Sequence, residues 1–117
     1  MMVNPRRGEI GAILDGSERT LCLTLGALAQ LEAAYAADDL TALVARFSGG
    51  RLSALDLMRI IGAGLRGAGQ DVSDEDVGRM QVENGAAGFA AIAAELLTVT
   101  FGASEPMAAG ERSPANP

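Results

Sequence analysis

Histidine is absent from the 117-residue sequence, which removes the side chain that most often serves proteins as a general base or a metal ligand. Cysteine occurs once, so the chain cannot form an internal disulfide, and nothing in it requires an oxidising compartment. That residue, Cys22, stands among leucines, and we expect a small buried or edge side chain rather than a reactive thiol. We therefore expect a protein that is not an enzyme, with no catalytic residues, no metal and no cofactor.

Aromatic residues make up only 3% of the sequence, so the core must be built from aliphatic side chains. No stretch approaches the roughly 18 unbroken apolar residues of a membrane span. No apolar run follows Arg6 and Arg7, so the N-terminus does not read as a secretory signal. Because 49% of the residues are hydrophobic, we expect a folded protein, and a soluble cytoplasmic one with no membrane partner.

Lysine is also absent, and all nine basic residues are arginines. The net charge is −6 and the isoelectric point is near 4.5. An acidic domain repels nucleic acid, whose affinity for proteins comes largely from neutralised phosphates. The charge balance therefore predicts no direct binding of nucleic acid.

The pattern of the chain predicts a mostly helical α+β fold, in which an N-terminal β-hairpin precedes about five short helices in one small domain. Asp15-Gly16 between two apolar runs is a strong hairpin signal, with strands expected over residues 8–14 and 19–25. Apolar residues at helical spacing follow. The expected segments are a flexible arm over 1–7, a domain over 8–102 with its hairpin at 8–25 and helices at about 25–36, 39–47, 53–67, 73–82 and 86–101, and a disordered tail over 103–117.

Residues 52–77 carry the clearest local signals, because the same helix-start device occurs twice. Ser53 and Ser73 are good N-caps, and Asp56 and Asp76 stand three residues later, where they can close a capping box. Aspartate is shorter than the preferred glutamate, which weakens the reciprocal hydrogen bond. Gly62 and Gly64 lie inside the first helix, where close approach of a neighbouring element would compensate for their low helix propensity.

Three chemical alternatives in this region are weaker than structural explanations. The acidic residues 71–76 lack the ligand spacing of a calcium loop and suit the positive end of a helix better. Residues 62–67 match G-x-G-x-x-G but do not follow a predicted strand, so a nucleotide site is weakly supported. Ser17 and Ser53 have no base partner that would make them nucleophiles.

Two apolar stripes are candidates for a partner-binding surface, although both are first of all expected to form core. Five short helices and one hairpin make a thin core, so we expect some of the apolar surface to remain open to a partner or to a second copy. The candidate residues are Leu40, Leu43, Val44, Phe47, Phe89, Ile92 and Leu96.

Five segments of the chain follow one another in a distinctive order. They are a Gly-Glu start of the hairpin, T-L-G-A-L-A-Q-L-E at 24–32, L-S-A-L-D-L at 52–57, G-L-R-G-A-G at 64–69 and V-S-D-E-D-V at 72–77. Together, these segments resemble the small tail proteins of the gene transfer agents of alphaproteobacteria, phage-derived particles that package host DNA. The resemblance covers residues 8–102 and leaves residues 103–117 without a counterpart.

The resemblance implies a tail assembly chaperone that binds the tape-measure protein, keeps it soluble and helps to recruit the tail tube protein around it. A structural tail tube component is the alternative, which would be associated with the particle and could form a homo-oligomer. A small regulatory or nucleotide-binding domain is a third reading that draws only on residues 62–67 and Cys22.

Overall fold

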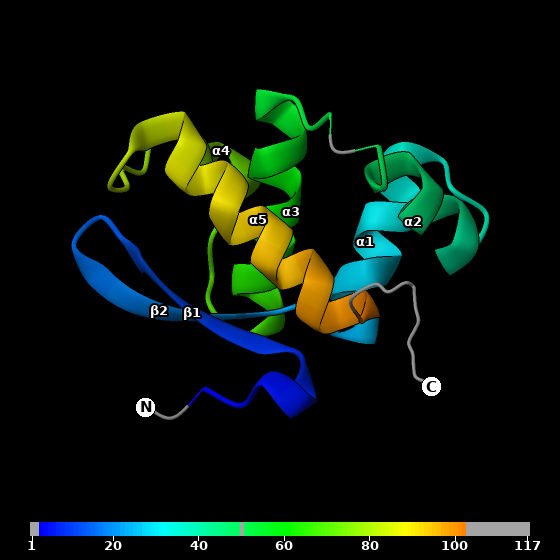
Figure 1. The fold of residues 1–117 in the computed structure, drawn as a ribbon, viewed down its shortest axis with the longest axis horizontal. Coiled ribbons are helices and arrows are strands. Elements are labelled where there is room, and N and C mark those ends of the chain that lie inside the picture. The colour runs from blue at the N-terminus through cyan, green and yellow to red at the C-terminus, as the bar shows by residue number, and fades with distance from the viewer. Residues whose placement is uncertain (1–2, 50, 103–117) are drawn as a thin grey trace, which may run out of the picture.

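The computed structural model describes residues 3–49 and 51–102, in which a two-stranded antiparallel hairpin precedes five α-helices (Figure 1). This architecture confirms the predicted fold class. The expected tail over 103–117 lies outside the described residues. The elements are a 3-10 turn Pro5–Arg7, the strands β1 Glu9–Leu14 and β2 Ser17–Cys22, and the helices α1 Leu25–Tyr35, α2 Leu40–Phe47, α3 Ala54–Gly67, α4 Asp74–Gly78 and α5 Gly85–Phe101.

The hairpin turns through only two residues, Asp15 and Gly16, whose φ angles are 53° and 76°. Two positive φ angles define the type I′ turn, whose twist matches that of the flanking strands, and Asp-Gly is a preferred pair for it. The turn sets Leu14 opposite Ser17 in the ladder. The second strand therefore begins and ends earlier than predicted, and Leu25 is the first residue of α1 and is 79% exposed.

The hairpin buries one face against helices of its own chain. Ile10, Leu14 and Leu21 are at most 2% exposed, while Ile13 points to the other side and is 55% exposed. Helix α3 packs against β2, and α5 packs mainly against β1. An isolated two-stranded hairpin is marginally stable in water, so these helices supply the surface that it needs.

The tip of the hairpin is joined to the segment that follows α4. The Asp15 N–H donates to the Gln81 carbonyl oxygen at 2.9 Å, and the Gln81 N–H donates to Asp15 Oδ1 at 2.8 Å. This pairing explains why α4 ends at Gly78, although the sequence pattern predicts a helix to about residue 82. A backbone whose amide and carbonyl both bind the hairpin cannot also continue a helical ladder.

Helix α3 lies at the centre of the fold and packs against β2, α1, α4 and α5 (Figure 1). Its Ile60, Ile61 and Leu65 side chains are fully buried. Both predicted capping boxes are formed, at Ser53 for α3 and at Ser73 for α4, and each aspartate accepts the reciprocal hydrogen bond despite its short side chain.

The glycines of α3 permit the close approach that the sequence predicts. A Cβ atom at Gly64 would lie 2.7 Å from Leu96 Cδ2 on α5 and 3.3 Å from Leu21 Cβ on β2. At Gly67 it would overlap the backbone carbonyl oxygen of Cys22. One face of α3 therefore lies directly against the strand and the last helix.

Candidate functional site

Three of the seven residues predicted to bind a partner belong to the hydrophobic core. Leu43 and Leu96 are fully buried, and Phe47 is 6% exposed. Phe47 also stacks edge-on against Tyr35, with ring centroids 5.2 Å apart. Substitutions at these positions would disturb folding before they could report on binding.

The other four predicted residues reach the surface. Leu40 and Val44 lie on α2 and are 40% and 36% exposed, and Phe89 and Ile92 are half-buried on α5. Val44 and Phe89 line two separate grooves near opposite ends of α5, and Leu40 and Ile92 line neither of these grooves.

The first groove lies between α2 and the end of α5, and we call it the α2–α5 groove. It contains Val44 from the predicted set, together with the edge of Phe47. Its α5 wall is made by residues that the predicted stripe omitted. The groove is lined by Val44, Phe47, Ser48, Leu97, Thr98, Phe101 and Gly102.

The second groove, which we call the α3–α4–α5 groove, lies where α3 and α5 begin and α4 ends, and it is almost entirely apolar. The volume of this groove is 150 Å³. Of the residues predicted to bind a partner, Phe89 alone lines it. Met58 lies against Gly78, where an added Cβ would meet Met58 Cε at 2.8 Å, so that glycine brings α4 close to α3. The groove is lined by Ala54, Leu57, Met58, Val77, Gly78, Ala86 and Phe89.

A polar cluster centred on Asp56 joins α1, α2 and α3 beside these grooves. The Asp56 side chain is 3% exposed and accepts hydrogen bonds from the Tyr35 hydroxyl and, at 2.8 Å, from the Ser53 N–H. Arg46 Nη2 lies 3.2 Å from Asp56 Oδ1. Burial by itself would raise the pKa of Asp56, but the hydrogen bonds from Tyr35 and Ser53 and the charge of Arg46 outweigh it, so that the pKa lies below its ordinary value.

Tyr35 should therefore ionise only at strongly alkaline pH. Its pKa is raised to about 12, chiefly by burial and then by the hydrogen bond to Asp56, while Arg59 partly offsets the rise. Because the folded pKa is raised, the contribution of Tyr35 to stability is complete below its unfolded value of about 10 and is lost as pH rises toward about 12. The chain has one tyrosine and no tryptophan, so tyrosinate absorbance during a pH titration measures this pKa directly.

Asp56→Asn is the matched variant for this titration, because it keeps the side-chain shape and removes the negative charge. The pKa of Tyr35 should then fall toward that of the urea-unfolded chain. A folded parent chain that titrates like the unfolded one would contradict the cluster.

The weaker chemical alternatives find structural explanations. Within the described residues, no three acidic or cysteine side chains gather as a metal site. Asp74 pairs with Arg66 at 3.0 Å, and Asp76 pairs with Arg79 at 2.8 Å. The glycine-rich run at 62–67 lies wholly inside α3, so it does not form the strand-to-helix turn that cradles phosphate.

Cys22 is half-buried, and its Sγ lies 3.6 Å from the Arg7 carbonyl oxygen. Burial and, to a lesser extent, the charge of Glu9 raise the pKa of Cys22, so less of the thiol ionises to the reactive thiolate. No helix in the described part of the chain has the length and apolar character needed to cross a bilayer.

The chain matches a known protein family. The family model described as "Phage tail tube protein, GTA-gp10" matches residues 7–103, which span both strands and all the described α-helices. No curated protein and no solved structure matches the chain.

Proposed function

The chain belongs to the GTA-gp10 family of phage tail tube proteins, and we propose that it is a structural, particle-associated component of the tail of a gene transfer agent. The family match over most of the chain carries this proposal. It favours the tube component over the assembly chaperone that the sequence analysis put first.

The surface supports a role in assembly. Two open apolar grooves flank α5, and each could accept a side chain or a helix of a neighbouring tail protein. The excess of acidic residues suits a protein that works beside packaged DNA without binding to it. Oligomerisation with further copies and contact with other tail proteins follow from this role.

Protein composition of purified particles tests the proposal. Quantitative mass spectrometry should find this chain in many copies per particle, in a fixed ratio to the other tail proteins. A chain that is abundant in producing cells and missing from purified particles would contradict a tube role.

The two-stranded sheet favours a second candidate, the chaperone that binds the tape-measure protein. A tube that closes through β-strands needs more sheet than the described residues form. The α2–α5 groove could take an amphipathic helix through apolar anchors one helical turn apart.

Val44→Asp tests this second candidate, because Val44 lines the groove and is already 36% exposed. Co-purification with a coexpressed tape-measure fragment should fall about tenfold or more, since a buried unpaired charge opposes docking. Thr41→Asp, on the same helix and outside the groove, is the control. Equal recovery of the fragment with both variants would exclude the groove as its site.

A further inference from the structure

We propose that copies of this chain associate head to tail, with a cleft at the hairpin tip of one copy receiving an arginine-bordered surface of the next. The inference rests on the proposed tube function and specifies which surfaces of the subunit meet. The tip cleft is lined by Ile13, Asp15, Gly16, Gln81, Val82 and Glu83. The arginine face consists of Arg46, Arg51, Leu55 and Arg59.

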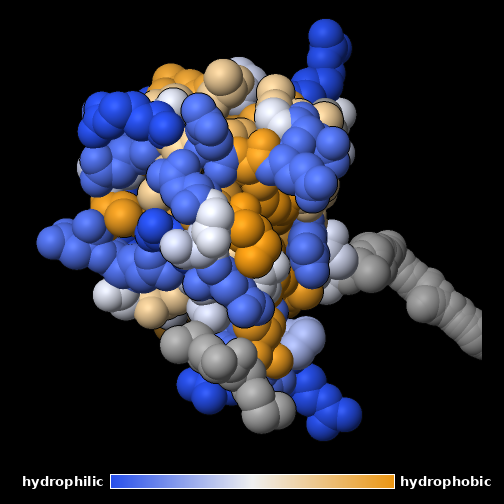
Figure 2. All heavy atoms as spheres, turned by 90° about the vertical axis from the view of Figure 1, so that its left-hand side faces the viewer, coloured by the Kyte–Doolittle hydropathy of each residue, from blue (hydrophilic) through white to orange (hydrophobic). Residues whose placement is uncertain are grey.

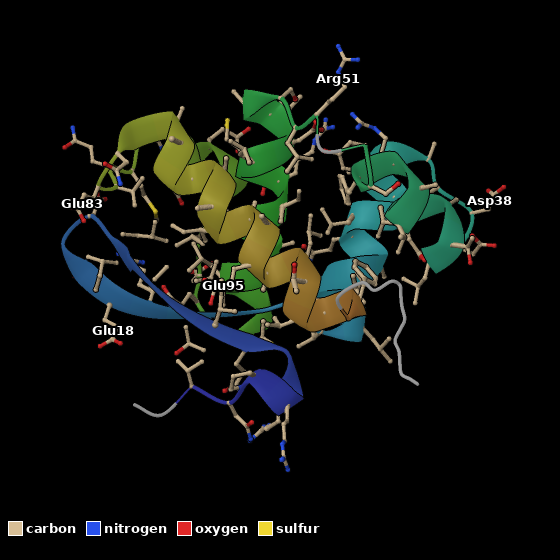
Figure 3. The ribbon with its side chains drawn as sticks, viewed as in Figure 1. Glu18, Asp38, Arg51, Glu83 and Glu95 are labelled. Atoms are coloured by element: carbon tan, nitrogen blue, oxygen red, sulfur yellow. The ribbon has the colours of Figure 1, made fainter. Side chains whose placement is uncertain are left out.

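The tip cleft combines exposed aliphatic surface with carboxylates. Ile13 is 55% exposed, and Val82 across the cleft is half-buried. Glu18 stands opposite Ile13 in the ladder, and Glu83 lies at the same end of the molecule (Figure 3). Figure 2, which views this side, shows hydrophobic surface reaching solvent between hydrophilic side chains.

The cleft is also preformed, because the two hydrogen bonds between Asp15 and Gln81 hold its walls together. A partner would therefore meet a surface that needs little ordering on binding. Preorganisation of this kind reduces the entropic cost of association.

The arginine face brings three guanidinium groups together on a protein whose net charge is −6, and one of them, that of Arg46, is paired with the buried Asp56 carboxylate. The Arg46 and Arg59 guanidinium carbons lie 4.9 Å and 5.0 Å from the centroid of the Tyr35 ring, which gathers both cations around one side chain. Arg51 projects away from the body just before α3 (Figure 3). It forms no ion pair with any described residue.

Leu55 gives the arginine face an aliphatic centre. It is 48% exposed and stands four residues before Arg59, on the same side of α3. The two surfaces thus have the same design with opposite charge: one exposed aliphatic side chain bordered by carboxylates, and one bordered by arginines.

Charge complementarity selects a second copy as the occupant. Two chains of net charge −6 repel each other over most of their surfaces, so the favourable approach is the one that brings arginines to the tip cleft. Because the two surfaces differ, the contact is heterologous. An open assembly of any length therefore keeps one free tip cleft at one end and one free arginine face at the other. Repeated addition of copies yields a ring or a filament.

Charge-reversal variants of the full chain test the electrostatic part of the contact. Sedimentation velocity measures their self-association over a range of protein and salt concentrations. The parent chain should self-associate, and salt should weaken the association. Arg51→Glu and Glu83→Arg should each weaken it about tenfold, and the double variant should restore it. Asp38→Arg is the control, since it changes the net charge as Glu83→Arg does but lies on the far side of the molecule (Figure 3).

The heterologous geometry is tested by mixing two variants, each with one surface blocked. Leu55→Asp blocks the arginine face and Ile13→Asp blocks the tip cleft, and both positions are already exposed. Each variant alone should be monomeric, and their mixture should stop at one-to-one dimers. A twofold dimer would give no such complementation.

The proposal is overturned by a parent chain that is monomeric at every concentration, by equal effects of Asp38→Arg and Glu83→Arg, or by a double variant that stays dissociated. These outcomes are separable from failure of the tube function. A chain abundant in particles but monomeric in solution would remove this contact alone, whereas charge-dependent assembly of a chain missing from particles would remove the tube role alone.

Discussion

Gly67→Ala is expected to destabilise the fold by about 3 kcal/mol, in the range of severe overpacking. The new methyl group would overlap the backbone carbonyl oxygen of Cys22, and Ala27 Cβ lies 3.4 Å away on another side. A carbonyl in β2 cannot rotate away as a flexible side chain can, so α3 and the hairpin must separate. Because small domains are stable by only about 5–15 kcal/mol, the loss should be obvious in urea unfolding.

Gly26→Ala is the matched control for this substitution. Gly26 is also helical, in α1, but the nearest atom to an added Cβ is Thr24 Oγ1 at 3.8 Å, an ordinary contact. Its unfolding midpoint should stay the same or rise slightly, because alanine has the higher helix propensity. Equal stability of the two variants would show that α3 does not lie against β2 as described.

Asp56→Ala is expected to cost about 3 kcal/mol at neutral pH, because it leaves the hydrogen-bond partners of a buried carboxylate unsatisfied. The substitution removes the acceptor of the Tyr35 hydroxyl and of the Ser53 N–H, and it also removes the ion-pair partner of the half-exposed Arg46. It also opens the capping box of α3. The measurement is again urea unfolding, here as a function of pH.

The pH dependence of the stability difference between the parent chain and Asp56→Ala tests whether the ionised Asp56 carboxylate causes it. Because the pKa of Asp56 is lowered in the folded chain, its stabilisation is complete above the unfolded value of about 3.9 and is lost as pH falls below that value. The difference in stability between parent and Asp56→Ala should therefore narrow in acid. Asp76→Ala, which opens the more exposed box of α4, should lose much less at neutral pH. A gap between parent and Asp56→Ala that stays constant in acid would contradict this account.

Local signals in the sequence predicted local structure well. Ser53 and Ser73 cap their helices because a hydroxyl three residues before a free N–H acts without help from distant parts of the chain. Asp15-Gly16 predicts the hairpin and the position of its first strand, but the second strand begins two residues earlier than predicted, because the turn has two residues instead of four. Recognising the type I′ turn would have set the correct register.

The candidate surface was harder to predict, because it depends on how helices cross. Helix α5 is rich in alanine and apolar around most of its circumference, so its pattern marks no single face. The predicted stripe named Phe89 and Leu96 together, whereas one lines a groove and the other is fully buried. The contact of Tyr35 with Asp56 joins residues 21 positions apart, and helical periodicity does not report it.

The covering of β1 by α5 has a consequence for the chain as it leaves the ribosome. The first strand is made early, and the helix that shields it comes last among the described elements. Throughout synthesis, the buried faces of Ile10 and Leu14 have no permanent cover, and the strand edges are open to other nascent chains. Folding of the described residues therefore cannot be completed before α5 has been made, and until then a higher concentration of newly made chains favours aggregation over folding.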